Sequence, residues 1–182
     1  MNGKIASDAV IQSLEKELTN LRVENWMNEV VFHWQWWLLL AVLIVPWLIW
    51  WKYVDRKHLL EIFTVGTVII ILSSYLDGIL TQYELWHYHF MVLPFLPCFL
   101  TADLSLLPVV YMFVYQFFCS FKRFLLAMTI VSGFLAFAGE PFLMWIDVYE
   151  MHSWEHYYSF PIYIAIGIIA RWLARTLAAK QE

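Results

Sequence analysis

WQWWLLLAVLIVPWLIWW, residues 34–51, is the stretch that decides the fold of this chain. Its length is close to the ~20 apolar residues that a helix needs to cross ~30 Å of hydrocarbon. Tryptophans lie at both of its ends, at the depths where aromatic rings anchor a span at the two membrane interfaces. Similar apolar segments follow at 59–77, 103–119, 124–145 and 160–173. The sequence therefore predicts an all-α, polytopic transmembrane helix bundle of about five spans.

The basic residues predict how this bundle is oriented. Eight of the 11 lysines and arginines lie on one side of the predicted spans: Lys52, Arg56, Lys57, Lys122, Arg123, Arg171, Arg175 and Lys180. The two loops on the other side, 78–88 and 147–159, carry none. Cytoplasmic loops are enriched in lysine and arginine. We therefore expect a bacterial cytoplasmic membrane protein with its N-terminus outside, its C-terminus in the cytoplasm, and its first span retained rather than cleaved as a signal peptide.

The composition excludes some classes of partner. Hydrophobic residues make up 62% of the chain and charged residues 14%, against about 45–50% and 25% in soluble domains. The lipid bilayer is therefore the expected partner. A net charge of −4 leaves no basic face to neutralise phosphates, which excludes nucleic acid. Cys98 and Cys119 lie in apolar surroundings, predict neither a disulfide nor a metal site, and no cofactor is expected.

Residues 1–30 form a separate segment ahead of the transmembrane bundle at 31–182. Its apolar stripe follows the 3-4 spacing of a short coiled coil: Ile11, Leu14, Leu18, Leu21 and Asn25. About two heptads are marginal alone in water, so the stripe has two interpretations. The helix either lies on the membrane surface with its apolar face down, or it joins copies of the chain into a homo-oligomer through residues 11–25.

The segment HFMVLPFLPCFL, residues 89–100, is apolar but cannot form a regular helix, because Pro94 and Pro97 remove backbone donors. It is also too short to span. One interpretation is a broken or re-entrant element whose polar backbone is satisfied by protein. The alternative is one long, kinked span that begins at His89.

Acidic residues inside the apolar spans are the most informative candidates, because an ionisable group there costs roughly 2.5–3.5 kcal/mol or more unless it is paired or wet. Counting 1.5 Å per residue from the basic loops places Asp77, Asp103 and Glu140 at one depth, toward the outer leaflet. These three acids are the predicted catalytic group. The alternative for Asp77 and Asp103 is that they cap helices at the interface.

The outer loops add polar and aromatic side chains above these acids, and two tyrosines lie on the third span. Together they predict an acidic chamber roofed by aromatic loops. The predicted ligand-binding residues are Glu84, Trp86, His87, Tyr111, Tyr115, Trp154 and His156.

Two histidine patterns raise the question of a metal, and the first of them, His87-Tyr88-His89, could offer two imidazoles. His152-Ser-Trp-Glu155-His156 matches the H-x-x-E-H pattern of inverted zinc peptidases. That chemistry needs both histidines on one helical face and a further acidic ligand far downstream. The pattern instead falls in a short tyrosine-rich loop near the end of the chain, so no metal site is predicted.

Several short motifs resemble a family of small, uncharacterised polytopic membrane proteins of spore-forming Firmicutes. They are WKY at 51–53, YLDGIL at 75–80, LWHYHF at 85–90, the spaced Pro94 and Pro97, Asp103 followed by PVVYMFVYQ at 108–116, GEP at 139–141, and Y-x4-W-x3-YSFPIYI at 149–164. The resemblance covers about residues 34–175 and implies a fold and a host but no reaction.

The chain also shows a weaker resemblance to membrane-embedded carotenoid (lycopene) cyclase domains. In those domains an aspartate ends one span, a W-x-Y follows, and a proline-acid motif provides the proton donor. Asp77, Trp86-His87-Tyr88 and Glu140-Pro141 follow that order. Here Glu140 precedes its proline, and the doubled acid of the family is missing.

Two classes of function are compatible with these residues. The first is a non-enzymatic membrane component, a ligand-binding, sensing or assembly subunit whose polar acidic and histidine cluster binds its ligand. The second is an intramembrane acid-base enzyme of cyclase or isomerase type, acting on an isoprenoid or lipid with Glu140 as proton donor.

Overall fold

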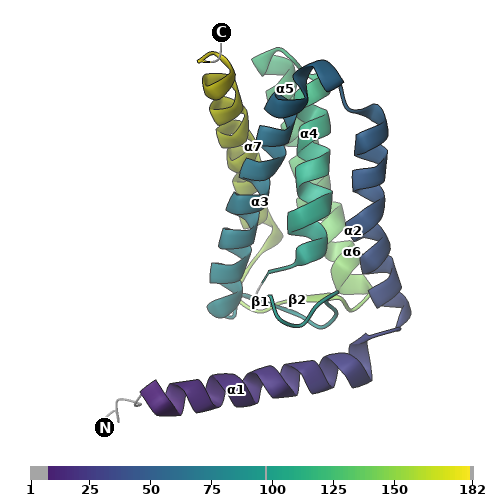
Figure 1. Cartoon of the computed structure of the whole chain (residues 1–182), viewed down its shortest axis with the longest axis vertical. Helices are drawn as coiled ribbons and strands as arrows, with labels where there is room; N and C mark the ends of the chain where they lie inside the picture. The colour runs from purple at the N-terminus through teal and green to yellow at the C-terminus, as the bar shows by residue number, and fades with distance from the viewer. Residues whose placement is uncertain (1–7, 97, 181–182) are drawn as a thin grey trace.

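The computed structural model describes residues 8–96 and 98–180 and shows an all-α bundle with one small pair of strands (Figure 1). The predicted fold class is confirmed. The helices are α1 (Asp8–Asn25), α2 (Trp34–Tyr53), α3 (Leu59–Gln82), α4 (Leu107–Phe117), α5 (Phe121–Phe134), α6 (Glu140–Trp145) and α7 (His156–Ala178). The strands are β1 (Trp86–Tyr88) and β2 (Tyr149–Met151). Short helical turns join them at Trp26–Val30, Arg56–His58, Ala102–Leu106 and Leu135–Gly139.

Four helices in the described ranges are long and apolar enough to cross a membrane: Trp34–Tyr53, Arg56–Gln82, Phe121–Trp145 and His156–Ala178. The third predicted span is a shorter apolar helix, Ala102–Phe117. It runs beside α3 through the middle of the bundle (Figure 1). Most of α4 is buried. This helix therefore packs mainly against its neighbours rather than facing the outside of the bundle.

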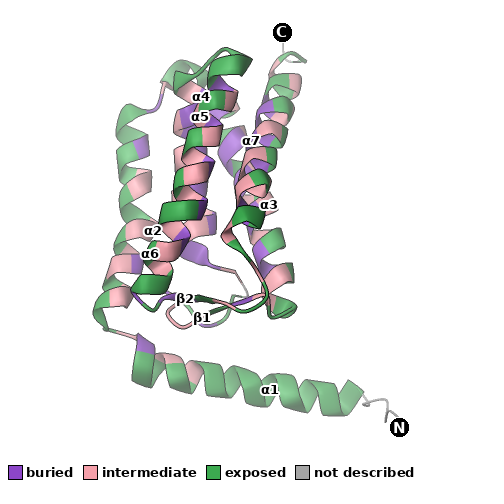
Figure 2. Ribbon diagram, turned by 180° about the vertical axis from the view of Figure 1, so that it is seen from behind, coloured by how far each residue is buried: buried purple, intermediate pink, exposed green. Residues whose placement is uncertain are grey.

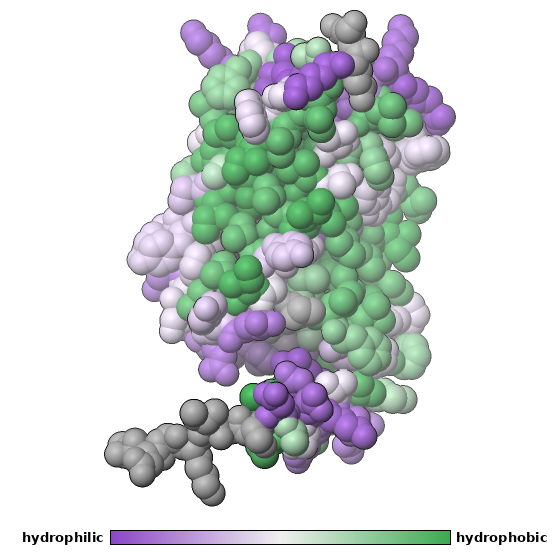
Figure 3. Space-filling model, turned by 60° about the vertical axis from the view of Figure 1, so that its left-hand side comes forward, coloured by the Kyte–Doolittle hydropathy of each residue, from purple (hydrophilic) through white to green (hydrophobic). Residues whose placement is uncertain are grey.

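The polar ends of the bundle differ in charge. The α2–α3 and α4–α5 connections and the C-terminal end of α7 lie together at one end, and the β1–β2 pair lies at the other (Figure 1). All eight basic residues of the predicted cytoplasmic side belong to the first end. Between the two ends the surface is largely apolar (Figure 3). This arrangement is compatible with a membrane protein.

Residues 89–100 precede α4 and do not join it in one long helix. The described part of this segment is irregular, and helix begins only at its end, so a long kinked span from His89 is not what the structure shows. Indole groups satisfy its backbone: Trp26 Nε1 donates to the Met91 carbonyl at 3.0 Å and Trp36 Nε1 to the Val92 carbonyl at 3.2 Å. Protein donors thus replace the water that this backbone would otherwise need. Pro97, one of the two prolines on which the prediction rested, lies outside the described residues.

Helix α1 lies crosswise beneath the β1–β2 end of the bundle and buries none of its residues (Figures 1 and 2). The predicted stripe is on the surface, with Ile11, Leu14, Leu18 and Leu21 all exposed. The structure therefore confirms a helix with an unpartnered apolar stripe. Self-association and attachment to the membrane surface both stay predictions.

Two glycines allow the central helices to approach one another closely. A Cβ on Gly66 of α3 would lie 2.6 Å from Met112 Sδ, and a Cβ on Gly167 of α7 would lie 2.8 Å from Met128 Cε. Small residues at helix interfaces are a common device of membrane bundles. The glycines that close α3 and α7 onto the bundle thus set the spacing of the helices around the candidate site.

Candidate functional site

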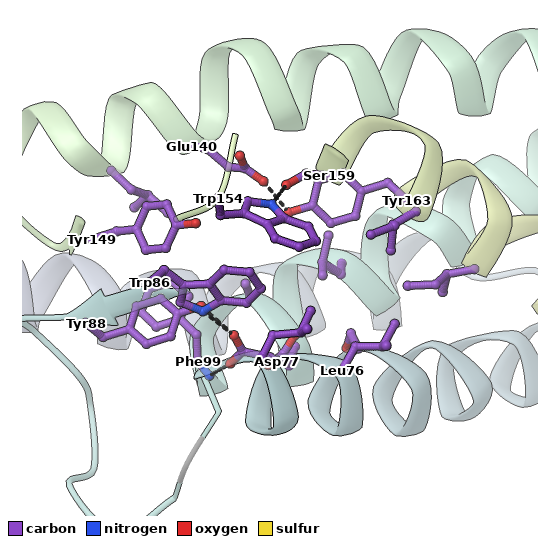
Figure 4. Close-up of a pocket in the computed structure, with 18 residues that line it drawn as sticks. Leu76, Asp77, Trp86, Tyr88, Phe99, Glu140, Tyr149, Trp154, Ser159 and Tyr163 are labelled. Atoms are coloured by element: carbon purple, nitrogen blue, oxygen red, sulfur yellow. Dashed lines mark hydrogen bonds between the residues drawn. The ribbon is translucent and has the colours of Figure 1, made fainter. Parts of the chain in front are cut away.

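A cavity of about 110 Å³ lies in the bundle toward the β1–β2 end. In Figure 4 its labelled side chains form two facing walls. One wall carries Asp77, Trp86, Tyr88 and Phe99, and the other carries Glu140, Tyr149, Trp154 and Tyr163. Asp103 also lines the cavity. The structure therefore brings the three predicted catalytic acids to one cavity.

Asp77 anchors the first wall from the last turns of α3. Its Oδ1 accepts hydrogen bonds from Trp86 Nε1 at 2.9 Å and from the Tyr88 hydroxyl at 2.7 Å. Its Oδ2 accepts the backbone N–H of Phe99 at 2.5 Å. Charge-assisted bonds of this kind are roughly twice as strong as neutral ones. One buried carboxylate thus ties β1 and the end of the irregular 89–100 segment to α3, which is more than the helix cap considered from the sequence.

Asp103 lies next to Asp77 but is less well satisfied. It is only 4% exposed, and its Oδ2 has no hydrogen-bond partner among the described residues. A buried polar atom without a partner is uncommon and calls for a specific explanation. Asp103 also lines the cavity, so this incompletely bonded carboxyl borders the space that a ligand would occupy.

Irregular helical turns place two of the acids. Asp103 belongs to the π-helical turn Ala102–Leu106, and Glu140 directly follows another, Leu135–Gly139. Each turn precedes a proline, and π-bulges occur frequently at functional sites. Pro108 lacks the N–H that would bond the Leu104 carbonyl. Trp47 Nε1 donates to that carbonyl instead, at 2.9 Å.

Glu140 is the centre of the second wall. Its Oε1 accepts the Tyr163 hydroxyl at 2.8 Å, and its Oε2 lies 2.8 Å from His156 Nδ1. The His156 side chain is 27% exposed, against 10% for Glu140. The chain Tyr163–Glu140–His156 therefore links the cavity to a partly exposed imidazole.

The β1–β2 pair forms an aromatic cover over the cavity. Its antiparallel register places Trp86 opposite Met151 and Tyr88 opposite Tyr149. Tyr88 stacks on Phe99 with ring centroids 4.7 Å apart, and the Trp86 and Trp154 rings meet edge to face at 5.3 Å. Burial and the neighbouring Asp77 carboxylate hold the pKa of the Tyr88 hydroxyl well above its ordinary value. Tyr88 therefore stays a hydrogen-bond donor.

Five of the seven predicted ligand-binding residues belong to the β1–β2 end of the bundle, and they differ in how they relate to the cavity. Trp86 and Trp154 line the cavity, and His156 contacts it through Glu140. Glu84 and His87 are exposed outside it. Strand geometry explains why His87 lies outside the cavity. Successive side chains of a strand point to opposite faces, so Trp86 and Tyr88 face inward and His87 faces outward. Although His87 is exposed, partial shielding from water by its neighbours, together with the nearby His89 and His152, lowers its pKa.

The two tyrosines predicted on the third span belong elsewhere. The Tyr111 hydroxyl donates to the Tyr163 carbonyl at 2.9 Å, so it supports the second wall without lining the cavity. Tyr115 lies near the basic end, where its hydroxyl donates to Glu61 and its ring lies 5.5 Å from the Arg171 guanidinium carbon. Tyr115 is therefore not part of the acidic site.

Several lining residues are not among those predicted from the sequence: Ser73, Tyr88, Phe99, Tyr149, Ser159 and Tyr163. Tyr88 could have been predicted from the sequence. The two-residue period of a strand puts Tyr88, and not His87, on the same face as Trp86. Tyr163 had a weaker signal. It lies two residues after Pro161 on α7, but no sequence spacing connects it to Glu140.

Among residues 8–96 and 98–180 no cluster of three or more histidine, cysteine or acidic side chains could hold a metal ion. The H-x-x-E-H pattern does not lie on one helical face, because His152 precedes α7 and only His156 belongs to it. The inverted zinc peptidase geometry is therefore not formed.

Comparison with protein-family models, with curated proteins and with solved structures gives no match. What the chain does is therefore inferred from its own geometry.

Proposed function

We propose that this protein is a membrane-embedded binding protein whose acidic cavity receives a small ligand with a positively charged or hydrogen-donating group. The observation that carries the proposal is the unpaired Oδ2 of Asp103, buried at the cavity wall beside the fully bonded Asp77. A donor from a ligand would supply the missing hydrogen bond. It would also relieve the repulsion between two neighbouring carboxyls in a low-dielectric site.

The rest of the lining favours an organic ammonium group. Three carboxyl side chains line the cavity, and none of its described lining residues is lysine, arginine or histidine. The polar part is surrounded by aromatic rings: Trp86, Tyr88, Phe99, Tyr149, Trp154 and Tyr163. Carboxylates together with aromatic faces are the chemistry by which proteins recognise such cations.

The size and apolar side of the cavity limit the ligand further. Leu76, Leu80, Leu143 and Ile166 add apolar side chains to its lining. Its volume of about 110 Å³ compares with roughly 150 Å³ for an engineered cavity that holds one benzene molecule. A short alkylamine, or the amine-bearing end of a larger membrane molecule, matches this space.

Thermal unfolding in detergent with n-butylammonium, and with neutral 1-butanol as the shape control, tests the proposal. Butylammonium is expected to raise the Tm of the wild type, and butanol is not. Asp103→Asn keeps the side-chain shape but removes the charge, so it should abolish the response. Asp147→Asn is the matched control. Asp147 is exposed at a positive φ of 61°, a conformation that asparagine tolerates. An equal response to butanol, or an unchanged response in Asp103→Asn, would contradict the proposal.

A second candidate function is the acid-base enzyme acting on an isoprenoid or lipid. The linked Tyr163, Glu140 and His156 favour it, because they connect the cavity to the outer surface through groups that exchange protons. Glu140 accepts a hydrogen bond from Tyr163, so within this candidate Asp103 is better placed than Glu140 to hold the transferable proton. Mass spectrometry of molecules that copurify with the protein separates the two candidates, since an isoprenoid and its cyclised product would favour the enzyme.

We also propose that the basic end of the bundle faces the cytoplasm of a bacterial cell, in line with the motif resemblance to proteins of spore-forming Firmicutes, and that residues 11–25 join copies of the chain. The charge difference between the ends supports the orientation. The exposed α1 stripe supports the association.

Cysteine labelling tests the orientation. In a variant without Cys98 and Cys119, a cysteine at Gln82 or Ser153 should react with an impermeant maleimide in intact cells. A cysteine at Lys57 or Lys180 should react only after the cells are opened. Gln82 and Ser153 are exposed near the β1–β2 end, and Lys57 and Lys180 are exposed at the basic end, so access differs only by membrane side. The reverse pattern would invert the orientation.

A further inference from the structure

A second hollow lies at the opposite end of the bundle from the acidic cavity. It is a surface groove between the start of α5 and the last turns of α7. Cys119, Ser120 and Phe121 line one side of it, and Arg171, Trp172 and Arg175 line the other, with Lys180 beyond them. No aspartate or glutamate is among its described lining residues. The groove is therefore cationic, in contrast to the acidic cavity.

Arg171 gives this groove a fixed positive charge. It is only 5% exposed, and its guanidinium carbon lies 4.6 Å from the centre of the Phe124 ring. Its nitrogens donate to the Phe118 and Cys119 carbonyls, the former at 3.1 Å. These acceptors are neutral, so they hold the guanidinium in place without neutralising it. A buried charge usually has a charged partner, whereas these acceptors of Arg171 are neutral carbonyls.

Arg175 and Lys180 extend the positive surface from Arg171 to the rim. Arg175 Nη2 donates to the Cys119 carbonyl at 3.1 Å, and neither rim residue forms an ion pair within the described part of the chain. The nearby Glu61 accepts the Tyr115 hydroxyl. Ser120 caps the Arg123 N–H in the first turn of α5, and the positive end of the helix there favours an anion. Three cations and a helix start thus converge with little neutralisation.

The position of the groove decides which anion it meets. It lies between α5 and α7 at the basic end of the bundle, next to the apolar surface that Figure 3 shows between the two ends. Exposed apolar rings flank the charges, with Trp172 64% and Phe121 54% exposed. A soluble anion would make no contact with these rings. A lipid, in contrast, places its phosphate beside the cations and its acyl chains beside the rings. Basic pockets between transmembrane helices on the cytoplasmic side bind anionic lipid headgroups in this way.

We propose that this groove is a binding site for an anionic phospholipid of the adjacent leaflet. Arg175 and Lys180 contact the phosphate at the rim, and Arg171 adds its charge from behind. Trp172 and Phe121 pack against the acyl chains. The site is separate from the acidic cavity and does not depend on what that cavity binds.

The exposed thiol of Cys119 lies in the groove and serves as the reporter. The full chain is placed in nanodiscs of phosphatidylcholine alone or with 30% phosphatidylglycerol, and the rate of Cys119 alkylation is measured in each. Phosphatidylglycerol is expected to slow alkylation in the wild type severalfold. Arg175→Gln with Lys180→Gln should weaken the lipid affinity roughly tenfold to thirtyfold, as the loss of two interfacial cations implies, and should remove the protection.

Lys52→Gln with Lys57→Gln is the matched control, because it removes two exposed cations from the same end of the bundle but outside the groove. This variant should keep the protection. If it loses the protection equally, the attraction is a general surface effect and the proposal is wrong. Protection by soluble glycerol phosphate in phosphatidylcholine nanodiscs would instead indicate a soluble phosphate ligand and would overturn the lipid assignment.

Discussion

Asp77→Ala should lower the free energy of unfolding by about 3–5 kcal/mol, the largest loss we expect from a polar substitution in this chain. Asp77 accepts Trp86 Nε1, the Tyr88 hydroxyl and the Phe99 N–H. All three donors would be left without their acceptor in a site that excludes most water. Each buried donor without a partner costs roughly 1–3 kcal/mol. Unfolding in detergent by heat or SDS, followed by tryptophan fluorescence, measures the loss.

Two further variants isolate the cause of this loss. Asp77→Asn retains one acceptor oxygen but turns an amide donor toward one of its partners, so its loss should be intermediate. Glu84→Ala removes an exposed acid just after the same helix, α3, and should change stability by less than about 0.5 kcal/mol. If Asp77→Ala were as stable as Glu84→Ala, Asp77 would not hold β1 and the 89–100 segment to the bundle.

Gly167→Leu is expected to be the most damaging apolar substitution, with a loss of about 3 kcal/mol. A Cβ at this position would lie 2.8 Å from Met128 Cε and 3.2 Å from Tyr111 Cε1. Met128 has some freedom to move, but the Tyr111 ring is held by its hydrogen bond to the Tyr163 carbonyl. A leucine would push α7 away from α4 and α5 and disturb the wall that carries Tyr163.

Gly133→Leu is the matched control for that substitution. A Cβ on Gly133 would meet only Phe160 Cε2, at an ordinary 3.7 Å. The same change of glycine to leucine within a predicted span should therefore cost much less stability at 133 than at 167. Equal losses at the two positions would indicate a general effect of leucine in place of glycine rather than a close contact at Gly167.

The acids of the candidate site could be found from the sequence because of a simple length argument. Each lies about the same number of residues from a basic loop, and a helix rises by a constant 1.5 Å per residue. Equal depth followed for Asp77, Asp103 and Glu140. Equal depth does not place residues on facing sides of one cavity, because that depends on how each helix is rotated and on which helices are neighbours.

Two of the predicted ligand-binding residues lie away from the cavity because of contacts that the sequence does not reveal. His87 has the chemistry of a ligand-binding residue, but the pairing of β1 with β2 turns it outward and turns Tyr88 inward. Tyr115 shares a span with Asp103 but lies near the basic end, where it contacts Glu61 and Arg171. Strand pairing and helix neighbours are contacts between segments far apart in sequence, and local spacing carries no record of them.

The sequence by itself determined the class of the protein, the approximate spans and the separation of basic from acidic ends, because hydropathy, helix rise and charge are local properties that add along the chain. Only the tertiary structure decided that Asp77 binds Phe99 across 22 residues and that Glu140 binds Tyr163 across 23. It alone decided that Arg171 is hydrogen-bonded to the α4–α5 connection and lines a cationic groove there. Those contacts form because buried polar groups must find partners wherever folding brings them, and the choice of partner is made in space rather than along the sequence.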